Sequence, residues 1–169
     1  MTAGKNFEEQ IKKSCKKQGI YYYRLRDTSN AWDKDEEKDE EKEDKGDKKK
    51  IRFTPKNLSD FILHYDKFTI HFEAKTHLGK SIPQKAIKQA KDMAEINHQG
   101  VLCLFALNYR EVNETYLITA KDIMRCLETR KSVDLQFCRN NGVLIPQRLK
   151  RVNYFFDIRY ALEKFINNF

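Results

Sequence analysis

The clearest pattern of hydrophobic and polar positions in this chain lies between residues 60 and 75. Apolar and polar residues alternate on both sides of Asp66 and Lys67, as in two antiparallel strands joined by a tight turn. With that turn, Asp60 lies directly opposite Glu73, and directly opposed residues share one face of a sheet. Strand alternation adds Lys75 to this face. The apolar residues fall on the other face and predict a core surface: Phe61, Leu63, Phe68, Ile70, Phe72 and Ala74.

The remaining hydrophobic periodicity indicates an α/β fold. Phe7, Ile11 and Cys15 recur at helical spacing, and residues 101–107 are apolar enough for a buried central strand. Thr119 is expected to cap the helix that follows it. The predicted elements are a helix around residues 7–15, a strand at 20–25, the hairpin, a loop at 79–83, a helix at 86–97, strands at 101–107 and 115–118, a helix at 120–128, an irregular basic segment at 129–151 and a helix at 155–169. We predict a single domain over residues 1–169, with a mixed, twisted sheet of about five strands flanked by helices.

Charge is distributed unevenly along the chain. The formal net charge of the 169 residues is +8. Residues 33–50 contain ten acidic and seven basic residues, a net charge of −3, so the remainder carries +8 − (−3) = +11. We predict that this tract is a solvated, mobile insert, because its lysines at positions 34, 38 and 42 would repel one another in a helix. The basic remainder suggests a polyanionic partner.

Nothing in the composition indicates a membrane or an extracellular protein. No apolar run approaches the length of a membrane span, and the first residues lack the apolar core of a secretory signal. The four cysteines are widely spaced and include no C-x-x-C pair. We therefore expect a cytoplasmic protein with reduced thiols, without a membrane partner or a zinc site.

The polar face of the predicted hairpin is a candidate catalytic site. Two carboxylates and a lysine on a rigid hairpin can bind a divalent cation and an anionic substrate. We assign Asp60 and Glu73 to a Mg²⁺ ion, with Mn²⁺ as the alternative, and Lys75 to the stabilisation of negative charge in the transition state. The competing interpretation is a hairpin whose polar face is merely hydrated, but Asp and Lys are poor strand formers and favour the site.

Two further residues are candidates for the same site. Glu8 lies at the edge of the apolar stripe of the first helix and could be a further ligand or base, or only a glutamate favoured by the helix dipole. Gln89 could reach the metal or a phosphate, although a surface glutamine is the more common case.

Basic residues outside the hairpin are candidates for contacts with a nucleic-acid backbone. A charge run is usually a solvated face, but an excess of cations beside a phosphodiester site favours phosphate contacts. The candidates are Arg24, Arg26, Arg130, Lys131, Lys150 and Arg151.

Together these motifs resemble a known family. The Asp60 … Glu73-Ala74-Lys75 pattern is similar to that of the PD-(D/E)xK nuclease superfamily, and nearly the whole chain resembles the RecU-type Holliday junction resolvases. The opening helix (Gly4-Lys5-Asn6-Phe7-Glu8-Glu9-Gln10-Ile11), the segment Gln89-Ala90-Lys91-Asp92-Met93 and the basic motifs Arg130-Lys131-Ser132 and Lys150-Arg151-Val152-Asn153-Tyr154 carry this resemblance.

The resemblance implies a PD-(D/E)xK nuclease-like fold and a homodimer that cuts four-way DNA junctions by paired, Mg²⁺-dependent nicks. It implies metal roles for Asp60, Glu73 and Gln89 and a transition-state role for Lys75, and it favours a site role for Glu8. In two respects this chain differs from the family pattern. Leu58 stands where the family often has a threonine, and the stretch corresponding to the family's junction-entering arm contains the net negative tract.

These differences leave alternatives to a junction resolvase. One is another nuclease of the same superfamily, acting on flapped, nicked or plain duplex DNA. The other is a nucleic-acid-binding protein without catalysis, against which the intact Asp60, Glu73 and Lys75 argue.

Overall fold

The computed structural model describes residues 2–25 and 57–167, and its centre is a six-stranded mixed sheet. The strand order is β1-β2-β3-β5-β6-β8. β3 and β5 are parallel, and every other neighbouring pair is antiparallel. The strands are β1 (Tyr21–Arg24), β2 (Phe61–Tyr65), β3 (Phe68–His77), β5 (Val101–Tyr109), β6 (Glu114–Thr119) and β8 (Val143–Leu144). The predicted α/β fold with a mixed sheet is confirmed.

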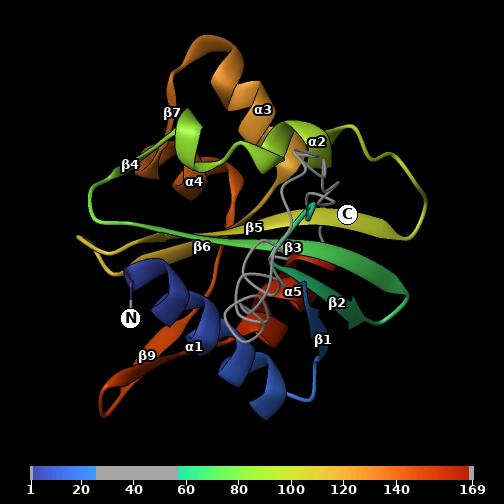
Figure 1. Cartoon of the computed structure of the whole chain (residues 1–169), viewed down its shortest axis with the longest axis vertical. Helices are drawn as coiled ribbons and strands as arrows, with labels where there is room; N and C mark the ends of the chain where they lie inside the picture. Colours follow the sequence, from blue (N-terminus) through green and yellow to red (C-terminus); the bar gives the residue numbers. More distant parts are fainter. Residues whose placement is uncertain (1, 26–56, 168–169) are drawn as a thin grey trace, which may run out of the picture.

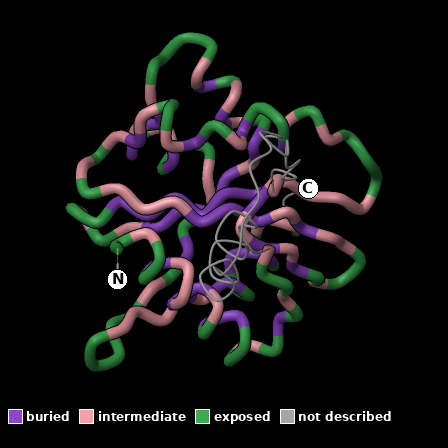
Figure 2. The backbone as a smooth tube through the Cα atoms, in the orientation of Figure 1, coloured by how far each residue is buried: buried purple, intermediate pink, exposed green. Residues whose placement is uncertain are grey.

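Helices cover both faces of the sheet (Figure 1). On one face, α1 (Ala3–Lys17) and α5 (Ile158–Ile166) pack on β2 and β3 through a core that includes Phe7, Phe72 and Leu162. On the other face, α2 (Gln89–Ala94), α3 (Ala120–Thr129) and α4 (Leu135–Asn141) pack on β5 and β6. Burial is concentrated along the central strands between these two layers (Figure 2).

The hairpin of β2 and β3 forms in the predicted register. Phe61 pairs with Phe72, and Tyr65 pairs with Phe68, so the turn falls at Asp66 and Lys67. Asp66 takes the left-handed conformation, with φ 53°, which Asp tolerates better than most residues. The predicted apolar face belongs to the core on the α1 side, so hydrophobic alternation was sufficient to fix this element.

The helices α1 and α3 also form where the pattern places them. Phe7, Ile11 and Cys15 are the buried stripe of α1. The backbone N–H of Asp122 donates to the side-chain hydroxyl of Thr119 at 2.9 Å, so Thr119 is the N-cap of α3 as predicted.

Several predictions for the second half of the chain are wrong. Residues 79–83 are not only a loop, because β4 (Ser81–Pro83) pairs with β7 (Ser132–Asp134). The helix predicted at 86–97 is replaced by the 3-10 turn η3 (Gln84–Ala86) and the short α2. Residues 129–151 are largely regular and contain β7, α4, β8 and β9 (Gln147–Lys150). These strands have two to four residues, which is too short to show a periodicity, and β4, β7 and β8 pair with strands distant along the chain.

The end of the chain differs from the prediction in one further respect. The last helix begins only at Ile158, where the backbone N–H of Tyr160 donates to the capping Asp157 carboxylate at 3.2 Å. Phe155 belongs instead to β10 (Asn153–Phe156), which pairs with β9 in a two-stranded hairpin.

Two predictions fall on residues that the structure does not describe. The charged insert at 33–50 and Arg26 both lie outside the described ranges. Within those ranges, no helix is both long and apolar enough to cross a membrane.

Candidate active site

Asp60 and Glu73 are joined by reciprocal hydrogen bonds at the point where β2 begins. The backbone N–H of Asp60 donates to Glu73 Oε2 at 2.7 Å, and the N–H of Ala74 donates to Asp60 Oδ2 at 3.0 Å. These bonds continue the β2–β3 pairing through side chains, so the ladder itself holds both carboxylates in place. The two acids are on one face of the hairpin, as the alternation predicted.

Lys75 completes the cluster from the same strand face as Glu73. Its ammonium forms an ion pair with Glu73 Oε1 and lies 3.9 Å from Asp60 Oδ2. The side chain of Glu73 is fully buried, whereas those of Asp60 and Lys75 keep 22% and 24% exposure. The cluster is therefore open to solvent on the Asp60 and Lys75 side and closed behind Glu73.

Burial sets the electrostatics of the cluster. Desolvation, followed by repulsion from Asp60, raises the pKa of Glu73 above its ordinary value, although Lys75 opposes this change. Burial lowers the pKa of Lys75, but the negative charges of Glu73, Asp60 and Glu8 outweigh it, so the net change is upward. Lys75 is thus held as a cation, and Glu73 takes a proton more readily than a free glutamate.

Glu8 reaches the border of this cluster from α1. Burial, and next the negative charge of Asp60, raise the pKa of Glu8, and the positive charges of Arg24 and Lys75 oppose that change. Arg24, at the end of β1, donates from Nη2 to Glu8 Oε2 at 2.5 Å. The structure therefore brings Glu8 to the site, and it places Arg24 against a carboxylate, a pairing that the sequence pattern did not reveal.

The donor set of this site fits Mg²⁺. Across the described ranges 2–25 and 57–167, no three His, Cys, Asp or Glu side chains form a ready cage for a metal ion. Mg²⁺ does not require one, because it is usually bound by one or two carboxylates and keeps several waters. Glu73 Oε1 is buried and receives no hydrogen bond of regular geometry, although the Lys75 ammonium lies beside it. Such an oxygen has a lone pair to offer a metal ion, and Asp60 and Glu73 would hold that ion.

Among the residues that the structure describes, no hydrogen bond or ion pair connects Gln89 with Asp60, Glu73 or Lys75. Gln89 is the first residue of α2 and is half-buried. Glu73 is in register with Phe105, which belongs to the core that α2 covers, so Gln89 is in the layer on the Glu73 side of the sheet. Its role as a ligand stays a prediction.

The predicted DNA contacts are not gathered in one place. Arg130 forms an ion pair with Asp134, and Lys131 beside it is exposed. Lys150 and Arg151 are at the end of the β9–β10 hairpin. In Figure 1 the α3–β7 connection and this hairpin lie at opposite ends of the molecule, with the sheet between them.

Sequence reasoning missed a polar network next to Lys75. Thr76 Oγ1 donates to Asn108 Oδ1 at 2.7 Å, and Asn108 Nδ2 donates to Thr115 Oγ1 at 2.8 Å. Asn108 and Thr115 are buried. The three residues come from β3, β5 and β6 and fix the end of β3 that follows Lys75. Only the pairing register brings them together, so no local signal marks them.

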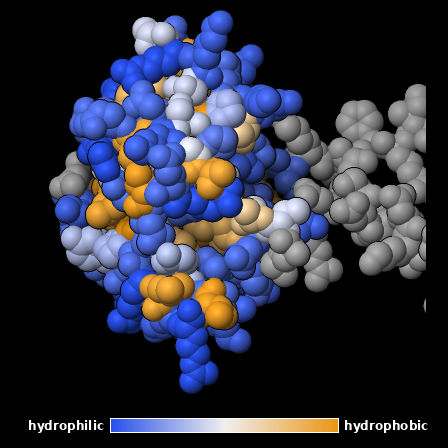
Figure 3. Space-filling model, turned by 90° about the vertical axis from the view of Figure 1, so that its left-hand side faces the viewer, coloured by the Kyte–Doolittle hydropathy of each residue, from blue (hydrophilic) through white to orange (hydrophobic). Residues whose placement is uncertain are grey.

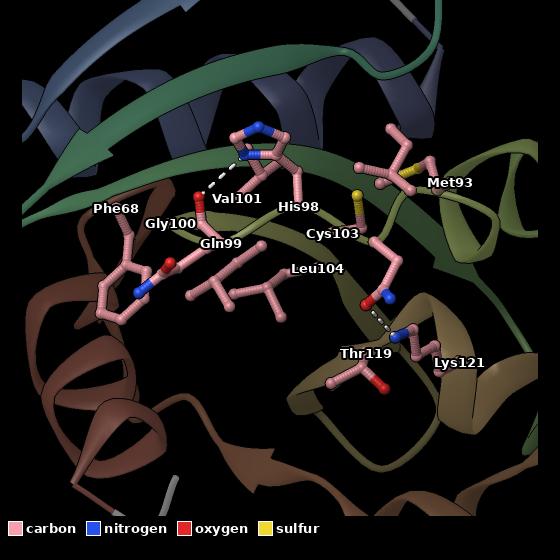
Figure 4. A pocket seen from close by; sticks show the side chains of 13 residues that line it. Phe68, Met93, His98, Gln99, Gly100, Val101, Cys103, Leu104, Thr119 and Lys121 are labelled. Atoms are coloured by element: carbon pink, nitrogen blue, oxygen red, sulfur yellow. Dashed lines mark hydrogen bonds between the residues drawn. The ribbon is translucent and has the colours of Figure 1, made fainter.

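A separate pocket of about 300 Å³ opens at the far end of β5 (Figure 4). Its lining is largely apolar and includes Phe68, Met93 and Leu104, and Lys121 donates to Asn97 Oδ1 at 3.2 Å at its edge. None of the clustered acids lines this pocket, so it is not part of the candidate active site.

The chain is similar to known proteins of one family. A family model described as Recombination protein U (RecU) matches residues 3–159. A protein of Streptococcus thermophilus named Holliday junction resolvase RecU is 30% identical over 101 residues, which are 56% of this chain and 51% of that protein. Its namesake from Streptococcus oralis is 32% identical over 99 residues, 55% of this chain and 50% of the relative. The chain thus spans about half the length of the curated relatives it matches.

One solved structure is similar to this fold. The Holliday junction resolvase Hjc of Archaeoglobus fulgidus superposes with a TM-score of 0.49 at 13% identity, over 82% of this chain and 93% of Hjc.

Proposed function

We propose that this chain, which belongs to the Recombination protein U (RecU) family, is a Mg²⁺-dependent DNA endonuclease that resolves Holliday junctions by paired nicks. The observation that carries the proposal is the joining of Asp60, Glu73 and Lys75 at the start of β2. The matched relatives are named as junction resolvases, which supports the four-way junction as substrate.

The residues of the cluster have complementary parts in phosphodiester hydrolysis. A bound divalent cation supplies charge stabilisation and an activated water. Asp60 and Glu73 would hold that ion, and their fixed backbone hydrogen bonds keep them in place without reorganisation. The Lys75 ammonium, which stays protonated beside two acids, would face negative charge on the scissile phosphate.

A second carboxylate-cation pair, Glu8 with Arg24, lies at the border of the cluster and would support it. The Glu8 carboxylate is held by Arg24, so its position next to Asp60 is fixed from α1. We propose that Glu8 orients water molecules on the side of the cluster where the substrate binds. Arg24 would neutralise Glu8 first and approach a phosphate with its remaining N–H groups.

Cleavage assays with two matched substrates test the proposal. The purified chain is incubated with an end-labelled four-way junction and with a linear duplex of the same arm sequence, each with Mg²⁺, with Mn²⁺ and with EDTA. We expect symmetric nicks in the junction that require the divalent cation and little cutting of the duplex. Equal cutting of both substrates would reduce the proposal to a general nuclease. Tight junction binding without any cutting in either metal would support the non-catalytic alternative.

A further inference from the structure

The β9–β10 hairpin ends in a tip that is exposed on all sides. Residues 148–152 are all exposed, and the apolar Leu149 and Val152 keep 59% and 83% of their surface. In Figure 1 this hairpin extends from the lower left of the molecule. At the same lower end, Figure 3 shows apolar side chains next to strongly hydrophilic ones. Two exposed apolar residues at the end of a projecting hairpin offer apolar contact to a partner outside the chain.

The base of the hairpin is firmly attached to the body. The backbone N–H of Phe156 donates to Ser14 Oγ at 3.0 Å, and Gln18 Nε2 donates to the carbonyl of Phe156 at 2.8 Å. The ring of Phe156 packs edge to face on Phe7, with centroids 5.2 Å apart. On the other strand, Gln147 Nε2 donates to the carbonyl of Asn113 at 2.8 Å. The tip is therefore exposed but carried on a rigid support.

The charge of the hairpin has one sign. Residues 147–156, which form the hairpin, contain three cations, Arg148, Lys150 and Arg151, and no acidic residue. Arg148 and Lys150 lie over the ring of Phe155, at 5.0 and 4.7 Å from its centroid. Three effects lower the pKa of Lys150. The largest is the positive charge of Arg148, the next is desolvation, and the smallest is the positive charge of Lys17 on α1. The described neighbours thus leave the positive potential of the tip uncompensated.

From this combination we infer that the hairpin tip is a wedge for branched DNA, in which Leu149 and Val152 contact unstacked bases while Arg148, Lys150 and Arg151 hold the flanking phosphates. This inference rests on the proposed function and extends it to how the substrate is selected. Charge argues against contact between the tips of two copies of the chain, because such contact would bring like charges together, whereas a polyanion complements them. Apolar side chains that enter base steps are a known way for proteins to bind deformed DNA.

The wedge would act on branched DNA rather than on plain duplex because of stacking energy. Opening a step in a continuous duplex costs a few kcal/mol, whereas stacking is already interrupted at a branch point. Apolar contact at the tip therefore favours a branch, and the cations favour both substrates equally. Selectivity and general affinity are then separable by mutation.

The test compares two double variants with wild-type full chain, using Kd for the labelled junction and the matched duplex in EDTA. Leu149→Ser/Val152→Ser should weaken junction binding by roughly ten-fold, as lost apolar contact, and change duplex binding by less than about two-fold. Lys150→Ala/Arg151→Ala should weaken both substrates alike and flatten the salt dependence of binding. Leu144→Ser, at another exposed apolar residue (48% exposed) outside the hairpin, is the matched control and should leave both constants unchanged.

A base analogue at the branch point reports the wedge directly. 2-Aminopurine placed there should brighten on binding of wild-type protein, and this gain should be lost with Leu149→Ser/Val152→Ser. An unchanged junction-to-duplex ratio and an unchanged fluorescence gain would overturn the wedge while leaving the nuclease proposal intact. A variant that instead changes the sedimentation of the protein would assign the tip to contact between copies and overturn it as well. If wild type binds neither substrate, both proposals fall.

Discussion

At the scale of single residues, the site depends on a fully buried glutamate between a partly exposed acid and a lysine. Glu73 is ordered by the N–H of Asp60, and its second oxygen has only the Lys75 ammonium beside it. Burying a carboxylate with so few hydrogen bonds is costly unless its charge is compensated. The Lys75 ammonium supplies part of this compensation, so the three members of the cluster should respond to mutation in different ways.

Removal of the Asp60 charge is the most direct test of the site. We expect Asp60→Asn to lower the single-turnover cleavage rate by at least roughly 10²-fold, because it removes a negative ligand from the site. Lys75→Ala should lower the rate by a comparable factor while leaving Mg²⁺ binding measurable by calorimetry. Asp66→Asn, in the exposed turn of the same hairpin, is the control and should cleave normally. Near-normal cleavage by Asp60→Asn would contradict the assignment.

The raised pKa of Glu73 should make the free energy of unfolding depend on pH. Burial, and then repulsion from Asp60, raise this pKa from 4.5 to about 7. Between these values the folded chain binds more protons than the unfolded chain, so the free energy of unfolding falls as the pH rises. Without divalent cation, we expect this group alone to remove about 1 to 3 kcal/mol over that window. Urea unfolding of Glu73→Gln should show a flatter pH dependence than wild type; equal slopes would mean that the glutamate is not desolvated.

At the scale of elements, capping and strand pairing position the site more than helix propensity does. Short segments such as α2 and the β4–β7 pair hold their shape through contacts with distant parts of the chain. For example, the N–H of Leu135 donates to the carbonyl of Lys80 at 2.8 Å, and Ser81 Oγ donates to Ser132 Oγ at 2.7 Å. Helix α3, in contrast, carries its own start signal at Thr119.

The cap of α3 allows a prediction at this scale. Thr119→Ala removes the hydroxyl that accepts from the Asp122 N–H, which should cost about 1 kcal/mol in the free energy of unfolding. Thr119→Ser keeps the hydroxyl and should lose much less. Thermal or urea unfolding of the two variants measures the difference, and DNA cleavage should survive in both because Thr119 takes no part in the hydrogen bonds and ion pairs that join Asp60, Glu73 and Lys75. Equal stability of the Ala and Ser variants would show that the cap contributes little.

At the scale of the whole molecule, the exposed surface decides how copies of the chain can assemble. The apolar residues Ile158 and Leu162 of α5 are buried in the core of their own chain, and Phe155 lies under Arg148 and Lys150, so these three residues supply no surface for a dimer. An interface between copies, if built by described residues, must therefore come from other parts of the surface.

A two-fold dimer remains our prediction for the active form. Paired nicks on opposed strands require two active sites, and a two-fold assembly supplies them. Sedimentation at micromolar concentration should show a dimer, free or on a junction. Mixing wild type with an excess of Lys75→Ala should yield junctions nicked on one strand only. A monomer with full paired-nick activity would contradict the prediction.

The sequence by itself determined the parts of this protein whose physics is local. Alternation fixed the β2–β3 register, and with it the joining of Asp60, Glu73 and Lys75. Helical spacing fixed α1, and a capping residue fixed the start of α3. The tertiary structure alone decided the pairing of Arg24 with Glu8, the network from Thr76 to Thr115, and the short strands β4, β7 and β8. These features join residues distant along the chain, and a pairing energy between distant segments leaves no periodicity in either one.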